Sequence, residues 1–453
     1  MNTETSPRIS EAPFDILVAG AGIGGISAAL AAARAGHRVA LLEAAPEIGG
    51  TGVHSPVALV CTWFDRSGRF INRGLNEEYL PYLYNPESLA KGVIQTYHEE
   101  ELKKTYLRLL AAEPLLTVLT SCPVVSVERR DHSIHSVRVA DGRDFHVRVF
   151  VDSTADGNLA ALAGAEFQKG RESDGRLQPC TLTFRVDGVD FTAFGMDPSK
   201  PDWARWSDWH LIADGLLPYY QKLHRSGGTS NPREDVLSFP DRGGRSLLFN
   251  QTRMAGVDPT DPASVENAKI EGRKQIEEFW QAVRVHPAFA RTTGVTISTK
   301  LGIREGRRIT GDYILTAEDC LGEARFDDMV AACGYPLDIH DPSGTGSTDM
   351  RDIPGSGYYH IPYRCLVSKS FSNLLLGSRC ISGTHEAHSS YRVMPPVSAI
   401  GQAAGTAAGL LIRSGGDNLR SVDPAWIRYV LREANQFVEG ECRKPPFSIS
   451  PLQ

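Results

Sequence analysis

Residues 14–43 read FDILVAGAGIGGISAALAAARAGHRVALLE, the order of a buried strand, three spaced glycines, a helix, a second strand and a terminal acid. Gly20 allows a tight turn after the first strand, Gly22 allows a pyrophosphate to approach the backbone, and Gly25 allows the Ala-rich helix to lie close to the strand. The helix N-terminus attracts a phosphate because its first N–H groups lack partners. Glu43 ends the second strand, where its carboxylate can accept hydrogen bonds from ribose hydroxyls. The stretch therefore predicts a dinucleotide-binding unit.

Three later segments indicate which dinucleotide is bound. Residues 46–51 read PEIGGT, and the paired glycines let the backbone pass beside a cofactor without a side-chain clash. This extension resembles the flavoprotein version of the unit more than the nicotinamide version. Residues 147–158 read VRVFVDSTADGN, a buried strand followed by a turn. Residues 373–408 contain a strand, a loop and a helix rich in small residues.

Together with residues 302–313, which read GIREGRRITGDY, these segments resemble the FAD-dependent oxidoreductases related distantly to the fumarate reductase and succinate dehydrogenase flavoproteins. The resemblance covers both ends and much of the middle of the chain, and residues 190–260 are unmatched. It implies FAD, a glutathione-reductase-like α/β fold with a Rossmann domain, and redox chemistry at carbon, without identifying a substrate. The expected cofactor-binding residues are Gly20, Gly22, Ile23, Gly24, Gly25, Glu43, Gly50, Thr51, Val124, Ala155, Asp156, Arg379, Gly401 and Ala403.

The chain changes character in its middle, which predicts an inserted substrate domain of mainly antiparallel β structure. Strand-like segments there are separated by Pro, Gly and Trp, and Pro262–Val285 predicts a helix capped by Asp261. The predicted division is a disordered N-terminus (1–13), a discontinuous FAD-binding domain (14–180 and 300–435), the inserted substrate domain (181–299) and a C-terminal tail (436–453).

Two local patterns give further predictions. Trp203, Trp206 and Trp209 recur every three residues, which on a helix forms one aromatic face for core packing or a domain contact, with a wall of the substrate pocket as the alternative. Asp338–Tyr359 is rich in Gly, Ser, Asp and Pro and predicts a long loop that could act as a lid.

Composition excludes several classes of protein. The net charge of −6 over 453 residues shows no basic footprint for nucleic acid. Residues 1–12 lack the apolar core of a signal peptide, and the sequence has no apolar run long enough to predict an integral membrane segment, so we expect a cytoplasmic protein. The eight cysteines include no Cys-x-x-Cys pair, so no local redox disulfide or usual iron–sulfur spacing is expected. Cys61 follows the paired glycines and is the one thiol that could lie near the flavin.

The segment GTHEAHSSYRVM, residues 383–394, is the expected centre of the chemistry. Arg392 is the first choice, because a guanidinium offers a planar anion two hydrogen bonds and stays charged. The resemblance makes Arg392 the counterpart of the arginine that acts near the substrate in fumarate reductase, but other parts of that enzyme's pattern are missing. The spacing of His385 and His388 is one residue short of the zinc-protease motif and no third ligand is evident, so no metal is expected. The candidate catalytic residues are Arg392, His385, His388, Tyr391 and Arg304.

No second Gly-x-Gly-x-x-Gly follows a strand, so the sequence predicts no separate nicotinamide domain. Electrons would then pass to oxygen, a quinone, a carrier protein or a second substrate. The sequence favours a dehydrogenase or reductase that moves a hydride between flavin N5 and a C–C or C–O bond of a small polar substrate. A flavin hydroxylase is the alternative, although such enzymes usually have Gly-Asp where this chain has Gly377 and Ser378. A non-catalytic binding protein of the same fold is a third possibility, which the intact glycine loop disfavours.

Overall fold

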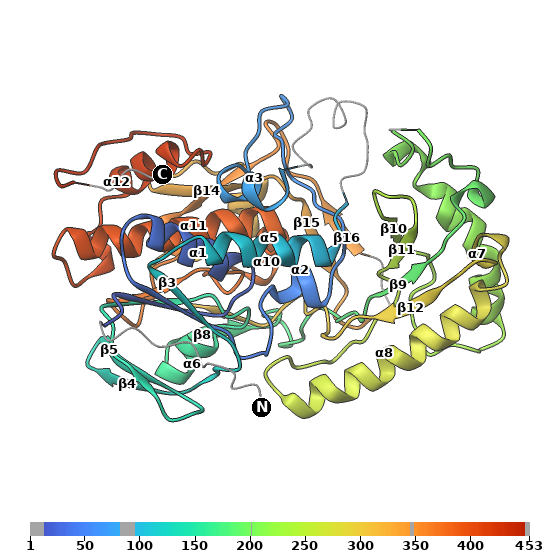
Figure 1. The fold of residues 1–453 in the computed structure, drawn as a ribbon, viewed down its shortest axis with the longest axis horizontal. Coiled ribbons are helices and arrows are strands. Elements are labelled where there is room, and N and C mark those ends of the chain that lie inside the picture. Colours follow the sequence, from blue (N-terminus) through green and yellow to red (C-terminus); the bar gives the residue numbers. More distant parts are fainter. Residues whose placement is uncertain (1–12, 82–95, 201, 345–347, 449–453) are drawn as a thin grey trace, which may run out of the picture.

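The computed structural model describes residues 13–81, 96–200, 202–344 and 348–448 (Figure 1). Its centre is a five-stranded parallel sheet in the order β18-β7-β1-β2-β3. Four of these strands are completely buried, which is why they read as nearly continuous hydrophobic runs and not as alternating ones. The strands are β1 (Ile16–Ala19), β2 (Val39–Leu42), β3 (Leu116–Leu119), β7 (Val149–Asp152) and β18 (Leu374–Leu376).

Two helices lie side by side on the parallel sheet, α1 (Ile23–Arg34) and α11 (Met394–Arg413), with α5 (Glu99–Ala111) beside α1 (Figure 1). Small residues line the contact between α1 and α11. A Cβ at Gly401 would lie 2.0 Å from the carbonyl oxygen of Gly24. The backbones of these two helices therefore approach more closely than side chains would allow.

Smaller elements surround this core. Antiparallel strands form the sheet β4-β5-β6 and the pairs β8-β13, β14-β17 and β15-β16. These strands are β4 (Val124–Arg130), β5 (Ser133–Val139), β6 (Asp144–Phe145), β8 (Phe167–Lys169), β13 (Arg307–Ile309), β14 (Met329–Cys333), β15 (Leu337–His340), β16 (Thr348–Arg351) and β17 (Tyr359–Pro362). The remaining helices of this body are α2 (Gly50–His54), α3 (Leu75–Tyr79), α6 (Asn158–Ala163), α9 (Ala317–Leu321), α10 (His385–Tyr391), α12 (Pro424–Glu433) and the short 3₁₀ helices Tyr363–Cys365 and Leu419–Ser421.

The prediction of a long loop over Asp338–Tyr359 was wrong. Strands β15 and β16 pair antiparallel within it, and β17 begins at its end. Residues 345–347 lie outside the described residues. The turn-forming residues that suggested a loop occupy the connections, whereas Leu337, Asp338 and His340 are buried on β15.

The inserted domain forms a separate body at the right of Figure 1, with a four-stranded antiparallel sheet in the order β10-β11-β9-β12. Its hydrophobic core consists of residues between Cys180 and Leu301. Asp261 caps α8 by accepting a hydrogen bond from the N–H of Ala263, as predicted, and Pro262 fits the first helical turn. The elements are β9 (Phe184–Asp187), α7 (His210–Arg225), β10 (Ser238–Pro240), β11 (Ser246–Phe249), α8 (Pro262–Val283), β12 (Gly294–Ile297) and the 3₁₀ helices Phe191–Phe194, Trp206–Asp208 and Pro287–Phe289. The predicted α/β fold with an antiparallel insertion is confirmed.

The three tryptophans do not form one helical face, because only a 3₁₀ turn forms at Trp206. Trp203 is buried against Phe191, with ring centroids 4.9 Å apart. Trp209 stacks on Phe239 with ring centroids 5.9 Å apart, and Trp206 is 45% exposed. The prediction of a common helical face was therefore wrong, but the predicted packing is confirmed for two indoles. Trp203 lies in the core of the inserted domain, and Trp209 packs against the cluster of Ala58, Phe239 and Leu248, where the two bodies meet.

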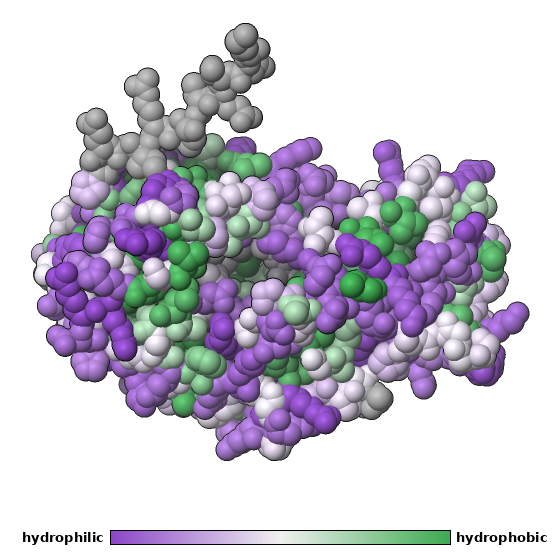
Figure 2. Space-filling model, turned by 90° about the horizontal axis from the view of Figure 1, so that it is seen from below, coloured by the Kyte–Doolittle hydropathy of each residue, from purple (hydrophilic) through white to green (hydrophobic). Residues whose placement is uncertain are grey.

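The two bodies are joined by polar and apolar contacts. Arg185 of β9 forms a two-point ion pair with Glu99, the first residue of α5, and the guanidinium is buried. Ala58 packs in a small apolar cluster with Phe239 and Leu248 of the inserted sheet. From below, both lobes are mainly hydrophilic, with small hydrophobic patches (Figure 2).

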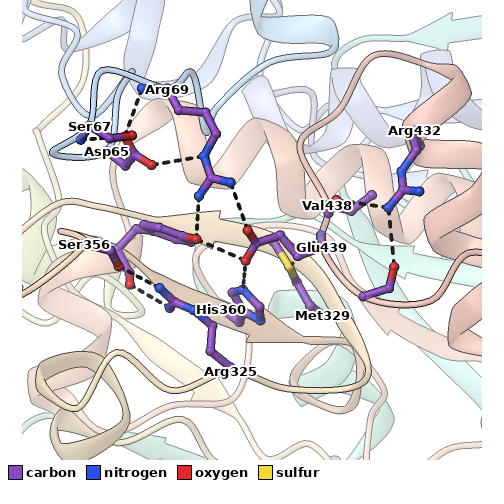
Figure 3. Close-up of polar contacts among 12 residues, drawn as sticks. Asp65, Ser67, Arg69, Arg325, Met329, Ser356, His360, Arg432, Val438 and Glu439 are labelled. Carbon is purple, nitrogen blue, oxygen red and sulfur yellow. Dashed lines mark hydrogen bonds and ion pairs between the residues drawn. The ribbon is translucent and has the colours of Figure 1, made fainter.

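A polar network fixes the segment after α12 (Figure 3). The carboxylate of Glu439 accepts hydrogen bonds from Tyr358 Oη at 3.0 Å, His360 Nε2 at 2.9 Å and Arg69 Nη1 at 3.0 Å. His360 Nδ1 accepts a hydrogen bond from the N–H of Phe326, so the ring is neutral with its proton on Nε2. Residues around Glu439 are therefore anchored to the large domain.

Candidate active site

The glycines of the first loop have distinct surroundings. Gly20 has φ +96°, and a Cβ at Gly25 would lie 1.7 Å from the carbonyl oxygen of Gly20. A Cβ at Gly24 would lie 2.2 Å from the carbonyl oxygen of Gly377. A Cβ at Gly22 would meet only the Cα of Gly50, at 3.7 Å. Gly24 and Gly25 therefore allow close packing, whereas Gly22 faces open space.

That space suits a pyrophosphate. Gly22 is the N-cap of α1, its backbone is extended, and no side chain caps the helix N-terminus. The first turn also carries no acidic residue that would repel an anion. An uncapped helix N-terminus beside a position without a side chain is the geometry that binds phosphate, so the residues present fit the diphosphate of FAD.

Glu43 is held beside the loop. Its Oε2 accepts a hydrogen bond from the N–H of Ala21 and its Oε1 one from the N–H of Ala45, both at 2.9 Å. Each carboxylate oxygen has a second lone pair that can receive a ribose hydroxyl. The carbonyl of Glu43 accepts a hydrogen bond from Cys122 N–H, which places the half-buried Val124 at the start of β4 close to the same end of the sheet.

Helix α2 connects the glycine loop to the second half of the site. Gly50, with φ +54°, begins α2 against Gly22, and Thr51 is exposed. Further along, a Cβ at Gly52 would lie 3.4 Å from Met394 Cε, two residues after Arg392. This five-residue helix therefore runs from the glycine loop to Met394.

A third group of predicted cofactor residues lies at the carboxyl end of β7. Asp156 Oδ1 is 3.0 Å from Arg379 Nη2, and the Asp156 carbonyl accepts a hydrogen bond from Arg307 Nη1. Ala155 and Asp156 are half-buried and accessible to a ligand. Gly401 and Ala403 are instead buried in α11, where Gly401 serves the close approach to α1.

Arg392 and Asp338 form an ion pair at the centre of a second group of residues, whose other charged members include Arg304. Arg392 Nη2 lies 3.2 Å from Asp338 Oδ2, and Tyr335 Oη donates to the same oxygen at 3.2 Å. Burial disfavours the charged carboxylate, but hydrogen bonding with His340 and the charges of Arg392 and Arg304 outweigh it and lower the pKa of Asp338 below its usual range. Asp338 is therefore an ionised, buried carboxylate that orients Arg392.

Arg304 adds a second guanidinium to this group. It is 7% exposed and donates from Nη1 to the carbonyl oxygen of Pro179 at 2.6 Å. Burial and the charges of Arg392, Arg233 and Arg253 lower the pKa of Arg304 to about 9, against the opposing effect of Asp338. The field at this position is therefore strongly positive, and an anion would relieve the repulsion between guanidinium groups.

The other candidate catalytic residues have buried surroundings. His385 Nδ1 lies 2.9 Å from Glu305 Oε1, and Glu305 also forms a buried ion pair with Arg308. Tyr391 Oη donates to the carbonyl oxygen of Ile381. His388 is 0% exposed and its ring nitrogens have no partner within the described part of the chain. Burial, followed by nearby arginine charges, holds the pKa of His388 well below its usual value, so it is neutral.

The sequence thus indicated Arg304 and Arg392, which the fold brings together, and missed the residues that join them. Asp338 and His340 alternate by two on β15, which places both on one face of the strand. Their Asp-x-His spacing could have indicated two polar side chains on one face of a strand. It was not used, because the segment was predicted to be a loop. Arg253 was missed because it belongs to the inserted domain and reaches His340 across the domain boundary.

Cys61 also lies within reach of the charges of Asp338 and Arg392. Burial raises the pKa of its thiol to about 12, so the thiolate is not available at neutral pH. Among residues 13–81, 96–200, 202–344 and 348–448, no three His, Cys, Asp or Glu side chains gather as a metal site would require. In the same ranges, no helix combines the length and apolar character needed to cross a membrane.

No curated protein matches the chain. It is similar to a crystal structure of GidA from Aquifex aeolicus, at 13% identity and a TM-score of 0.45, over 95% of this chain and 71% of that one. It is also similar to a geranylgeranyl bacteriochlorophyll reductase-like protein from Thermoplasma acidophilum, at 13% identity and a TM-score of 0.41, over 97% and 94%.

Thioredoxin reductase of T. acidophilum matches at 23% identity and a TM-score of 0.22, but over only 32% of this chain and 36% of that enzyme. The more specific resemblance to fumarate reductase flavoproteins stays a prediction. Residues 15–431 match the family model described as FAD dependent oxidoreductase. The chain therefore belongs to the family of FAD-dependent oxidoreductases.

Proposed function

We propose that this protein is a dehydrogenase or reductase that moves a hydride between flavin N5 and a C–C or C–O bond of a small anionic substrate. The observation that carries the proposal is the pair of arginines Arg304 and Arg392, whose charges act on each other. Met394, two residues after Arg392, lies at Gly52 of α2, and the start of this helix borders the pyrophosphate loop. Electrons would leave to oxygen, a quinone, a carrier protein or a second substrate.

The residues that would hold FAD are the loop around Gly22, Glu43, Thr51 and the pair formed by Asp156 and Arg379. Bound there, FAD supplies hydride transfer at its N5 atom. The uncapped N-terminus of α1 would neutralise the diphosphate. Glu43 would fix the ribose through the free lone pairs of its carboxylate.

The residue that would bind the substrate anion is Arg392. Its Nη2 is engaged by Asp338, but its Nε is buried without a hydrogen-bond partner among the described residues. A buried donor without a partner carries a free-energy cost of about 1–3 kcal/mol, which a carboxylate or enolate oxygen would remove. Arg304 would contribute a second positive charge without moving a proton, since burial leaves its pKa, at about 9, above neutral pH.

His385, His388 and Tyr391 would act behind the substrate and not on it. His385 is committed to Glu305, Tyr391 to a backbone carbonyl, and His388 is completely buried. We infer that they hold α10 in place, so that Arg392, directly after this helix, projects in a fixed direction.

The first test is a titration of the FAD-loaded protein with acetate, malonate and sulfate, followed by the change in the visible flavin spectrum. At least one anion should bind to the wild type, and Arg392→Lys should weaken that binding at least tenfold, because a lysine has no donor at the position of Nε. The matched control is Arg364→Lys, since Arg364 is half exposed and pairs with Asp328 elsewhere. It should leave the affinity unchanged.

The second test uses a substrate found by screening compounds for anaerobic reduction of the flavin. Reduction by Arg392→Lys should be slower by roughly 100-fold or more, the scale of losing one well-placed electrostatic contact, with normal FAD content. Fast reduction by this variant, or no binding of any anion by the wild type, contradicts the proposal. Reduction only by a nicotinamide, with oxygen consumed and a hydroxylated product, would favour the hydroxylase alternative.

A further inference from the structure

An unbroken chain of side-chain contacts runs from the inserted domain to Arg392. It begins at α8, where Gln275 Oε1 accepts a hydrogen bond from the N–H of Arg253 at 2.9 Å, and Gln275 Nε2 donates to the Arg253 carbonyl at 3.2 Å. Gln275 is buried in the core of the inserted domain. The backbone of Arg253 is therefore fixed to α8.

The guanidinium of Arg253 then reaches strand β15 of the large domain. Its Nη2 lies 3.1 Å from His340 Nδ1. A guanidinium can only donate, so Nδ1 accepts and the ring proton is on Nε2. Burial, followed by the charge of Arg304, lowers the pKa of His340 to about 3, which keeps the ring neutral at pH 7. Thr348 Oγ1 lies 3.2 Å from the same nitrogen, so Arg253 and Thr348 together hold this tautomer of His340.

The second ring nitrogen of His340 faces the carboxylate of Asp338, which in turn contacts Arg392. His340 Nε2 lies 3.4 Å from Asp338 Oδ1, and the opposite oxygen, Oδ2, lies 3.2 Å from Arg392 Nη2. The backbone of His340 is fixed as well, because its N–H donates to Gln178 Oε1 at 3.2 Å. The orientation of the carboxylate is therefore determined from both sides.

We propose that His340 is a positioning residue which, held in one tautomer by Arg253 of the inserted domain and Thr348 of β16, sets the orientation of Asp338 and thereby of Arg392. The inference rests on the proposed function, in which Arg392 binds the substrate anion. Its consequence is that the position of the inserted domain relative to the large domain controls the geometry of the anion site.

The main experiment measures anion affinity by the flavin difference spectrum, with malonate, acetate and sulfate as probes of the FAD-loaded protein. His340→Phe keeps an aromatic ring but removes the hydrogen-bond donor and acceptor of the imidazole, and should weaken anion binding at least tenfold. His340→Gln keeps one acceptor and one donor on a planar group and should restore most of the affinity. His286→Phe is the control, because His286 caps Ala288 and stacks on Phe194 within the inserted domain and makes none of these contacts, so this variant should bind as the wild type does.

A double-mutant cycle separates positioning from a general structural effect. If His340 acts through Arg392, adding His340→Phe to Arg392→Lys should weaken binding by less than about twofold beyond Arg392→Lys alone. Full additivity of the two losses overturns the inference. The inference is also overturned if the single variant His340→Phe binds the anion as tightly as the wild type while the single variant Arg392→Lys binds it more weakly.

Arg253 gives a second measurement that does not alter β15, in case His340→Phe fails to fold. Arg253→Met removes one positive charge and the contact with His340, whereas Arg233→Met removes one charge of the same group without that contact. Arg253→Met should weaken anion binding at least threefold more than Arg233→Met, and equal losses overturn the inference. If the wild type binds none of the three probes, or Arg392→Lys binds them as tightly, the proposed function itself fails.

Discussion

At the scale of single residues, neighbouring glycines of one loop meet different physical requirements. Gly25 has no room for a side chain, because a Cβ would lie 1.7 Å from a backbone oxygen. Gly22 has φ −81° and ordinary contact distances, so an alanine there is compatible with the fold. The side chain of an alanine at Gly22 would instead occupy the space that a pyrophosphate needs.

The two glycines can therefore be separated by experiment. Gly22→Ala should fold with unchanged stability but lose most of its FAD. Gly25→Ala should be destabilised by about 3 kcal/mol or more, at or above the upper end of the usual range for overpacking, with or without cofactor. Circular dichroism and thermal unfolding of the apoprotein, with flavin content after acid release, measure both effects. Full FAD occupancy in Gly22→Ala would remove the pyrophosphate from this position.

At the scale of elements, the contact between α1 and α11 decides what the small residues of α11 do. A Cβ at Gly405 would lie 2.1 Å from the carbonyl oxygen of Ala28, one helical turn beyond the equally close pair formed by Gly401 and Gly24. Two such contacts in register mean that the helix backbones touch, and no side chain fits between them. The glycines of α11 are therefore required by helix packing before any cofactor binds.

Gly401→Ala should consequently destabilise the apoprotein by about 1–3 kcal/mol and reduce FAD content only as a result. Gly294→Ala is a suitable control, because its Cβ would meet nothing closer than Asp187 Oδ2 at 3.9 Å. Urea unfolding of both apoproteins gives the free-energy difference. A stable Gly401→Ala apoprotein that cannot bind FAD would instead assign Gly401 directly to the cofactor site.

At the scale of the whole molecule, buried neutral histidines determine the response to acid. Burial lowers the pKa of His37, His340, His360 and His388. Between each lowered value and the ordinary 6.5, the unfolded chain binds more protons than the folded one, so stability falls as pH drops below about 6.5. Asp152 acts in the opposite direction, because burial raises its pKa to about 6.

Burial also lowers the pKa of His286, so five histidines against Asp152 predict a net loss. A histidine whose folded pKa lies below 5, such as His340, contributes about 2 kcal/mol to this loss at pH 5. The apoprotein should therefore be less stable at pH 5 than at pH 7.5, measured by urea unfolding. His360→Gln should reduce this difference, whereas a change at the exposed His132 should not. Equal stability at the two pH values would mean that these histidines are protonated in the folded protein.

The sequence alone determined the features whose cause is local. The strand, glycine turn and helix of residues 14–43 could be predicted because strand burial, glycine conformations and helix packing leave their marks within one short stretch. The cap of α8 by Asp261 follows from neighbouring residues in the same way. The separate, antiparallel character of the insertion was also visible, since its strands alternate with turn residues within 120 positions.

The tertiary structure alone decided where the charged residues meet. Arg253, His340 and Arg392 are far apart in the chain, and each lies in a different element, so no local pattern indicates their contact. The pairing of β15 with β16 and the packing of the inserted domain on the large domain bring these three residues together. The same holds for Gly401, since a small residue on a helix suits either a ligand or another helix, and only the packing of α1 against α11 chooses between them.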